Sequence, residues 1–198
     1  AGDVVWADHD QPDSVVAWQS LASVYRKDRD ARIKVYERGL KANPASIELT
    51  MLLGTELELA ERREDAIKLY ENLLKTNPEA EPAINNLAAL LLDYRSDKAS
   101  WARALELAKK LQAAENPAVL DTLGWAHYRN GQYAEAVSVL ERVVAKAPQF
   151  PIFHYHLGMA YVATGNKVGA KQELKRAVDE AQSDYPGLEE ARATLKKL

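Results

Sequence analysis

The chain has 198 residues, and it contains no cysteine and no long apolar run. The absence of cysteine excludes disulfides, thiolate metal sites and thiol catalysis. No segment approaches the roughly 20 consecutive apolar residues of a membrane-spanning helix. The net charge is −3, with acidic and basic residues mixed along the chain, whereas nucleic-acid binding usually requires a basic face. We therefore expect no membrane span and no nucleic-acid partner.

The sequence is compatible with more than one cellular compartment. The chain starts at Ala1-Gly2-Asp3 without a basic and then apolar leader, so we expect no signal peptide in this sequence. A mature or truncated exported protein would look the same. A cysteine-free chain suits an oxidising compartment, such as the periplasm, as well as the cytoplasm.

A repeated motif organises the residues that are present. A leucine followed by glycine or alanine recurs at intervals of 34, 36 and 34 residues. A period near 34 residues is typical of stacked helix–turn–helix units, and such arrays expose long surfaces that bind other chains. The motif stands at Leu53-Gly54, Leu87-Ala88, Leu123-Gly124 and Leu157-Gly158.

The clearest copy is residues 117–150. Its apolar positions between 120 and 128 follow the spacing of one helical face. Gly131 then breaks the helix, because glycine accepts the positive φ of a tight turn, and Pro148 ends the second helix. The small residues Gly124 and Ala136 allow the two helices to approach closely.

This pattern resembles the tetratricopeptide repeat, whose signature is W-x2-L-G-x2-Y…A-x3-F…P. The resemblance covers roughly residues 15–184. It implies an all-α fold, a right-handed superhelical solenoid of antiparallel helix pairs with about five units and a capping helix. Arg32 departs from the pattern, which expects a small residue there. The expected segments are a cap or the remnant of a preceding repeat at 1–14 (with Val4, Val5 and Trp6), units at 15–46 (degenerate), 47–80, 81–116 (with a long turn from Asp93 to Ser100), 117–150 and 151–184, and a capping helix at 185–198.

In the family that the chain resembles, the first helix of each pair lines the concave side of the solenoid. The resemblance therefore implies that first-helix residues not used for packing form the partner-binding face. Asparagine amides both donate and accept, which suits a peptide backbone. Exposed aromatic clusters commonly mark binding anchors, and we expect the rings of this face to be exposed. The candidate residues are Asn85, Asn86, Asp121, Trp125, Tyr128, Arg129, Tyr155, His156 and Met159.

Other readings of these residues are weaker. Chaperone-binding members of the family hold a carboxylate with Lys, Asn and Arg on successive first helices. Only Asn86 matches that clamp, so a chaperone-tail adaptor is not expected. His154 and His156 point about 200° apart on a helix and cannot share a metal ion. His154 and His127 stand at packing positions, and we interpret them as core histidines.

No catalytic motif is present. The chain lacks a P-loop, GxSxG, HExxH and a dinucleotide-binding glycine motif. We expect no catalytic residue, no metal and no cofactor. The predicted function is that of a protein–protein interaction scaffold, which binds a protein or peptide segment along its concave groove.

A narrower resemblance is to the repeats of bacterial proteins of exopolysaccharide and exosortase (PEP-CTERM-type) systems. The run Asp121-Thr122-Leu123-Gly124-Trp125 carries it, and it implies a bacterial origin and a role in envelope assembly. Two alternatives stay open, the non-catalytic recruiting region of a larger enzyme and a sensor that binds a peptide or glycan. Open array ends also allow self-association.

Overall fold

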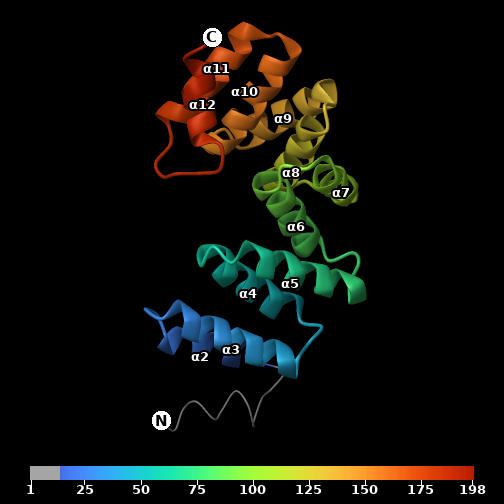
Figure 1. Cartoon of the computed structure of the whole chain (residues 1–198), viewed down its shortest axis with the longest axis vertical. Helices are drawn as coiled ribbons and strands as arrows, with labels where there is room; N and C mark the ends of the chain where they lie inside the picture. The colour runs from blue at the N-terminus through green and yellow to red at the C-terminus, as the bar shows by residue number, and fades with distance from the viewer. Residues whose placement is uncertain (1–13) are drawn as a thin grey trace. The chain divides into compact units, whose positions relative to one another are not determined.

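The computed structural model describes residues 14–198, and that part of the chain is helical without a strand (Figure 1). The predicted fold class is confirmed, since short turns join successive helices into pairs. The helices are α2 (Val15–Val24), α3 (Arg29–Ala42), α4 (Ile47–Leu59), α5 (Arg63–Thr76), α6 (Glu81–Tyr94), α7 (Lys98–Lys109), α8 (Pro117–Arg129), α9 (Tyr133–Lys146), α10 (Pro151–Thr164), α11 (Lys167–Asp179) and α12 (Leu188–Leu195).

The chain forms two compact units. Unit 1 ends at Leu87 and unit 2 is Ala88–Leu198. Within unit 1, α2 packs on α3 and α4 packs on both α3 and α5. Within unit 2, α8 packs on α7 and α9, α10 on α9 and α11, and α12 on α11 and α10. Within each unit, these helices therefore bury their apolar stripes against their neighbours along the chain.

Several helices begin at a side chain that caps them. Ser14, Asp28 and Ser46 each accept a hydrogen bond from the backbone N–H three residues later. Such caps satisfy one of the N–H groups that a helix start leaves without a partner. In unit 1, the helices then pack around Trp18 and Tyr70, both of which are fully buried.

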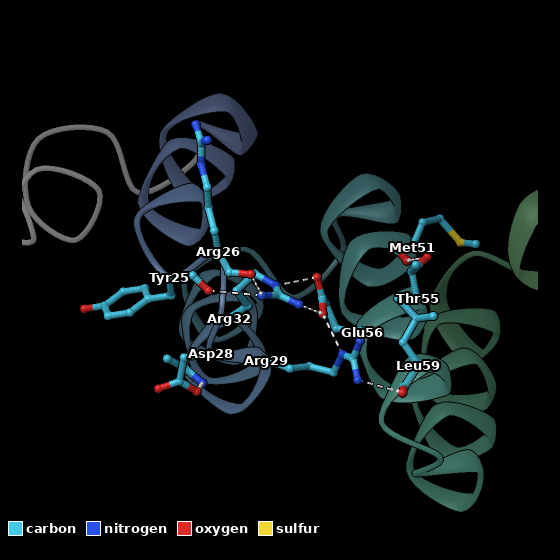
Figure 2. A network of polar contacts seen from close by, with 10 residues as sticks. Tyr25, Arg26, Asp28, Arg29, Arg32, Met51, Thr55, Glu56 and Leu59 are labelled. Atoms are coloured by element: carbon cyan, nitrogen blue, oxygen red, sulfur yellow. Dashed lines mark hydrogen bonds and ion pairs between the residues drawn. The ribbon is translucent and has the colours of Figure 1, made fainter.

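Arg32 has a structural role that the repeat pattern did not explain (Figure 2). It is the fourth residue of α3, where α5, α9 and α11 have alanine. Its guanidinium donates two 2.8 Å hydrogen bonds to the Glu56 carboxylate on α4, and two more to the carbonyls of Tyr25 and Arg26 at the end of α2. Arg32 therefore joins three helices of unit 1.

Close packing in unit 2 depends on the small residues of the repeat. A Cβ atom on Gly124 would lie 2.6 Å from Leu140, and one on Gly158 would lie 2.7 Å from Leu174. Ala136 and Ala160 are fully buried in one apolar cluster with Leu140. The prediction that Gly124 and Ala136 permit close helix packing is confirmed.

One predicted turn is wrong. The connection between α6 and α7 is only Arg95–Asp97, so there is no long turn from Asp93 to Ser100. Asp97 caps α7 through the Ser100 N–H at 2.8 Å and starts that helix early. The longer connection follows α7, at residues 110–116.

Near the C-terminus, α12 buries Leu188 and Ala191, while Glu189, Glu190, Lys196 and Lys197 are exposed. The possible N-terminal cap with Val4, Val5 and Trp6 lies outside the described residues. Among residues 14–198, no helix is both long and apolar enough to cross a membrane.

Candidate interaction site on the first helices

Five of the nine candidate residues are buried in unit 2. Trp125 is 4% exposed and Tyr155 is 2% exposed. The expectation that these rings lie open to solvent is therefore wrong. Burial also removes the other three from direct solvent contact, namely Asp121, His156 and Met159.

The buried side chains take part in bonds that join α8 to α10 and α10 to α12. His156 Nδ1 on α10 lies 2.9 Å from both carboxylate oxygens of Asp121 on α8. The Tyr155 hydroxyl on α10 donates a 2.7 Å hydrogen bond to Glu190 on α12. Both bonds join residues 35 positions apart. We call this pair of bonds the i, i+35 ladder.

Stacked rings fill the space beside the ladder. The Trp125 indole stacks on the His156 ring at 4.2 Å and on the Tyr128 ring at 4.6 Å, centroid to centroid. Tyr155 lies against Trp125 at a tilt, with its centroid 5.4 Å away. Stacked and tilted ring pairs stabilise a core beyond their area burial. The aromatic candidates therefore form an internal platform.

Arg129 is half-buried at the end of α8. Its guanidinium carbon lies 4.2 Å from the centroid of the Trp101 ring and 5.7 Å from that of Trp125. These are cation–π distances. One terminal N–H group also donates to the Arg95 carbonyl at 3.4 Å, but Nε is buried without a hydrogen-bond partner.

Asp93 on α6 is a residue of this cluster that the candidate set lacked. Burial, and to a smaller extent the nearby Asp121 carboxylate, raises the pKa of Asp93 to about 6, although His156, Trp125 and Arg129 lower it. Burial also raises the pKa of Asp121, which His156 partly offsets. The position of Asp93 on a first helix was visible in the sequence, but its place in this cluster depends on a histidine 63 residues away.

Unit 1 carries its own polar cluster, around Tyr70. The Tyr70 hydroxyl donates to Glu58 at 2.9 Å and accepts from the Asn86 amide at 3.2 Å. Burial raises the pKa of Tyr70 and of Glu58. Asn85 donates to Asn86 at 3.3 Å, while its own Oδ1 is buried without a partner.

The unpartnered atoms are informative as a group. Among residues 14–198, three buried side-chain polar atoms have no hydrogen-bond partner. A buried polar group without a partner costs free energy, so each such atom needs an explanation. All three lie on first helices and belong to the nine candidates: Asn85 Oδ1, Arg129 Nε and His156 Nε2.

Histidine provides no metal site in this part of the chain. The described residues contain no group of three or more His, Cys, Asp or Glu side chains that could hold an ion. His154 is fully buried between Glu173 and the Pro148 carbonyl, which confirms it as a core histidine. His127 is half-buried and bonded to Gln132 at 2.6 Å.

Comparisons with known proteins agree with this architecture. Residues 122–186 match a family model described as tetratricopeptide repeat. A TPR repeat-containing protein of Pseudomonas aeruginosa is 28% identical over 155 residues, which are 75% of this chain. The chain spans about a quarter of the length of that relative.

Solved structures show the same fold at low sequence identity. YrrB, described as a TPR protein with an unusual peptide-binding site, is 17% identical with a TM-score of 0.68, and the match covers 100% of this chain and 99% of that one. MamA from Desulfovibrio magneticus RS-1 is 17% identical with a TM-score of 0.67, covering 81% and 90%. At such identity the likeness concerns the fold alone.

Proposed function

We propose that this chain, whose residues 122–186 match tetratricopeptide repeats, is a non-catalytic scaffold that binds a segment of a partner protein on its first helices. The observation that carries the proposal is the presence of unpartnered polar atoms on two half-buried first-helix side chains, Asn85 Oδ1 and Arg129 Nε. Donors and acceptors without partners are complementary to the N–H and C=O groups of a bound peptide.

The half-buried candidate residues contact the bound peptide directly. Tyr128 and Arg129 serve in unit 2, and Asn85 and Asn86 in unit 1. The buried candidates act underneath, because side chains that are locked by packing hold the contacting groups in place. This supporting set is Asp121, Trp125, Tyr155, His156 and Met159.

The kind of partner follows from chemistry and from likeness. The amide groups of unit 1 and the guanidinium group of unit 2 each suit a peptide, and YrrB is described as having an unusual peptide-binding site. The Asp121–Trp125 run adds a finer proposal, a role in assembly of the bacterial envelope or of exopolysaccharide. Occurrence of a relative in Pseudomonas aeruginosa is compatible with that role.

The alternatives have less support. A glycan sensor would need open aromatic faces, and Trp125 and Tyr155 are 4% and 2% exposed. A recruiting region of a larger enzyme stays a proposal of its own, which the greater length of the Pseudomonas relative permits. No observation favours either one over a peptide-binding scaffold.

Selection of a displayed peptide library on the immobilised chain tests the proposal. We expect selected peptides to lose about tenfold in affinity on Arg129→Gln, because a hydrogen bond to a charged group contributes about 1.5 kcal/mol or more. Arg142→Gln, on the exposed surface of α9, is the matched control and should leave affinity unchanged. Equal affinities for wild type, Arg129→Gln and Asn86→Ala would refute the proposed face.

A further inference from the structure

Tyr70 on α5 carries a hydroxyl group that the packing of the helices does not require. It is the eighth residue of its helix, and the eighth residues of α9 and α11 are Leu140 and Leu174. All three side chains lie against the glycine of the preceding first helix, and a Cβ atom on Gly54 would overlap the Tyr70 hydroxyl. Since leucine fills this position in two other pairs without a polar group, the hydroxyl has a role beyond packing.

The Tyr70 hydroxyl lies in the middle of a chain of hydrogen bonds that runs from α6 through α5 to α4. Asn85 Nδ2 donates to Asn86 Oδ1 at 3.3 Å, and Asn86 Nδ2 donates to the Tyr70 oxygen at 3.2 Å. The Tyr70 hydroxyl donates to Glu58 Oε1 at 2.9 Å. Every group in this chain therefore donates in the direction of Glu58. We call these four side chains the amide chain of unit 1.

The Glu58 carboxylate sets the direction of the amide chain. An ionised carboxylate only accepts, so the Tyr70 hydroxyl must donate to Glu58 and keeps its lone pairs for Asn86. The Asn86 amide must then turn its NH2 group to Tyr70 and its oxygen to Asn85. Hydrogen bonds that run in one direction also polarise one another, which strengthens the terminal acceptor. The orientation of both amides thus depends on a charge at the far end of the chain.

The amide chain begins at an atom that lacks a partner. The Asn85 side chain is half-buried, and its Oδ1 atom is buried without a hydrogen bond. A carbonyl oxygen in this situation needs an N–H or O–H donor. In the opposite direction of the chain, the NH2 group of Asn85 would be left over, and it would need an acceptor. The direction set by Glu58 therefore decides which chemical group the site lacks.

We propose that Glu58, acting through Tyr70, is a positioning residue for the two asparagine amides, and that the segment bound at Asn85 supplies an N–H donor to Oδ1. This inference rests on the proposed function, because the donor belongs to the bound peptide. Two sources share this chemistry, a backbone N–H group and the side chain of a lysine or arginine. The same geometry disfavours a carboxylate or another acceptor at Asn85, which would face the bare oxygen.

NMR of the side-chain amide groups tests the positioning role in the free, full chain. Tyr70→Phe keeps the ring and removes the hydroxyl. We expect the amide signals of both Asn86 and Asn85 to change, although the Tyr70 hydroxyl bonds only to Asn86. Tyr161→Phe is the matched control, because it removes a tyrosine–glutamate bond in unit 2, and it should leave both signals unchanged.

Glu58→Gln separates the charge from the hydrogen bond. A glutamine amide either accepts from the Tyr70 hydroxyl or donates to it, so the amide chain is free to run in both directions. We expect the Asn85 and Asn86 side-chain signals to split or broaden. Glu48→Gln removes a charge from the exposed surface of the same helix and should have neither effect. Unaltered asparagine signals in both Tyr70→Phe and Glu58→Gln overturn the positioning role.

A selected peptide tests the donor. It is synthesised with one backbone N–H methylated at a time, and with each lysine or arginine replaced in turn by norleucine. One of these changes should weaken binding to the wild type about tenfold. The same change should have no effect on the Asn85→Leu protein, which lacks the acceptor. A sensitive methylated position identifies a backbone donor, and a sensitive norleucine position identifies a basic side chain.

Failure of the donor assignment is distinct from failure of the proposed function. If every change in the peptide weakens binding equally to the wild type and to Asn85→Leu, the donor assignment is wrong. The proposed function still stands in that case, provided that Arg129→Gln weakens binding. If no peptide is selected at all, the proposed function and the donor assignment both fail, and the amide signals of the free chain decide the role of Glu58 on their own.

Discussion

Two junctions at the same place in the repeat are built from opposite chemistry. In unit 1, Arg32 of α3 meets Glu56 of α4 through two 2.8 Å hydrogen bonds, with both side chains about 15% exposed. In unit 2, Ala136 of α9 and Ala160 of α10 occupy the corresponding places in a fully buried apolar cluster. The repeat tolerates either a small apolar contact or a complete ion pair there.

Each solution has a different physical basis. The alanines allow α9 and α10 to approach closely, so this junction depends on shape and burial. The Arg32–Glu56 junction depends on both charges being paired, since removal of one side chain leaves the other charge without its counterion. Arg29 reinforces it by donating to the Leu59 carbonyl at the end of α4. The α3–α4 junction of unit 1 therefore depends on specific polar bonds, and the α9–α10 junction of unit 2 on close packing.

Introducing one charged residue of the polar junction into unit 2, without its partner, should have the largest effect on stability. Ala136→Arg places an unpaired charge in the apolar cluster, and we expect a loss of about 4 kcal/mol in the free energy of unfolding. Ala136→Met separates added volume from added charge. Adding Ala160→Glu to Ala136→Arg should recover part of the loss. Denaturation curves measure all three, and an unaltered Ala136→Arg protein would contradict the packing described for this junction.

The contact between α10 and the segment that precedes α12 offers a third kind of junction. Gly187 has φ +99°, and a Cβ atom there would lie 2.2 Å from the Tyr155 ring. Gly165 has φ +81° with nothing within 4 Å. Gly187→Ala should therefore cost about 2 kcal/mol or more, and Gly165→Ala about 1 kcal/mol from backbone strain alone. Equal melting temperatures for the two variants would show that the ring moves aside freely.

The polar junction should give the smallest net effect, because its two changes offset one another. Arg32→Ala and Glu56→Ala should each lower the melting temperature, whereas the double variant, which recreates the alanine pair of unit 2, should be closer to wild type. Added salt should weaken the wild-type junction slightly through screening. A double variant as unstable as the sum of the single ones would show that the two side chains act independently.

The sequence predicted the helices better than the surface they present. The Asn130-Gly131 turn and the stop at Pro148 follow from local backbone preferences, and α8 and α9 end where expected. Arg32 was visible as a departure from the pattern, but its partner Glu56 lies 24 residues away on another helix. The repeat pattern therefore identifies an unusual residue but does not identify its bonding partner on another helix.

The candidate site shows the same limit. Trp125 and Tyr155 were expected to be exposed because their positions lie off the packing stripe of a single pair. Their burial comes from the next first helix and from α12, through the Asp121–His156 and Tyr155–Glu190 bonds. Asp93 was missed for the same reason, since its neighbours are on α8 and α10. The half-buried Asn85, Asn86, Tyr128 and Arg129 remain candidates for direct contact.

The i, i+35 ladder has a consequence for the order of the helix pairs. The carboxylate of Asp121 on α8 bonds to the imidazole of His156 on α10. The hydroxyl of Tyr155 on α10 bonds to the carboxylate of Glu190 on α12. The two bonds therefore use different pairs of chemical groups. Exchanging α8–α9 with α10–α11 would bring Tyr155 opposite Thr122 and Asp121 opposite Glu190. These helix pairs are consequently not interchangeable parts. Their order along the chain is fixed by which side chains can bond between α8, α10 and α12.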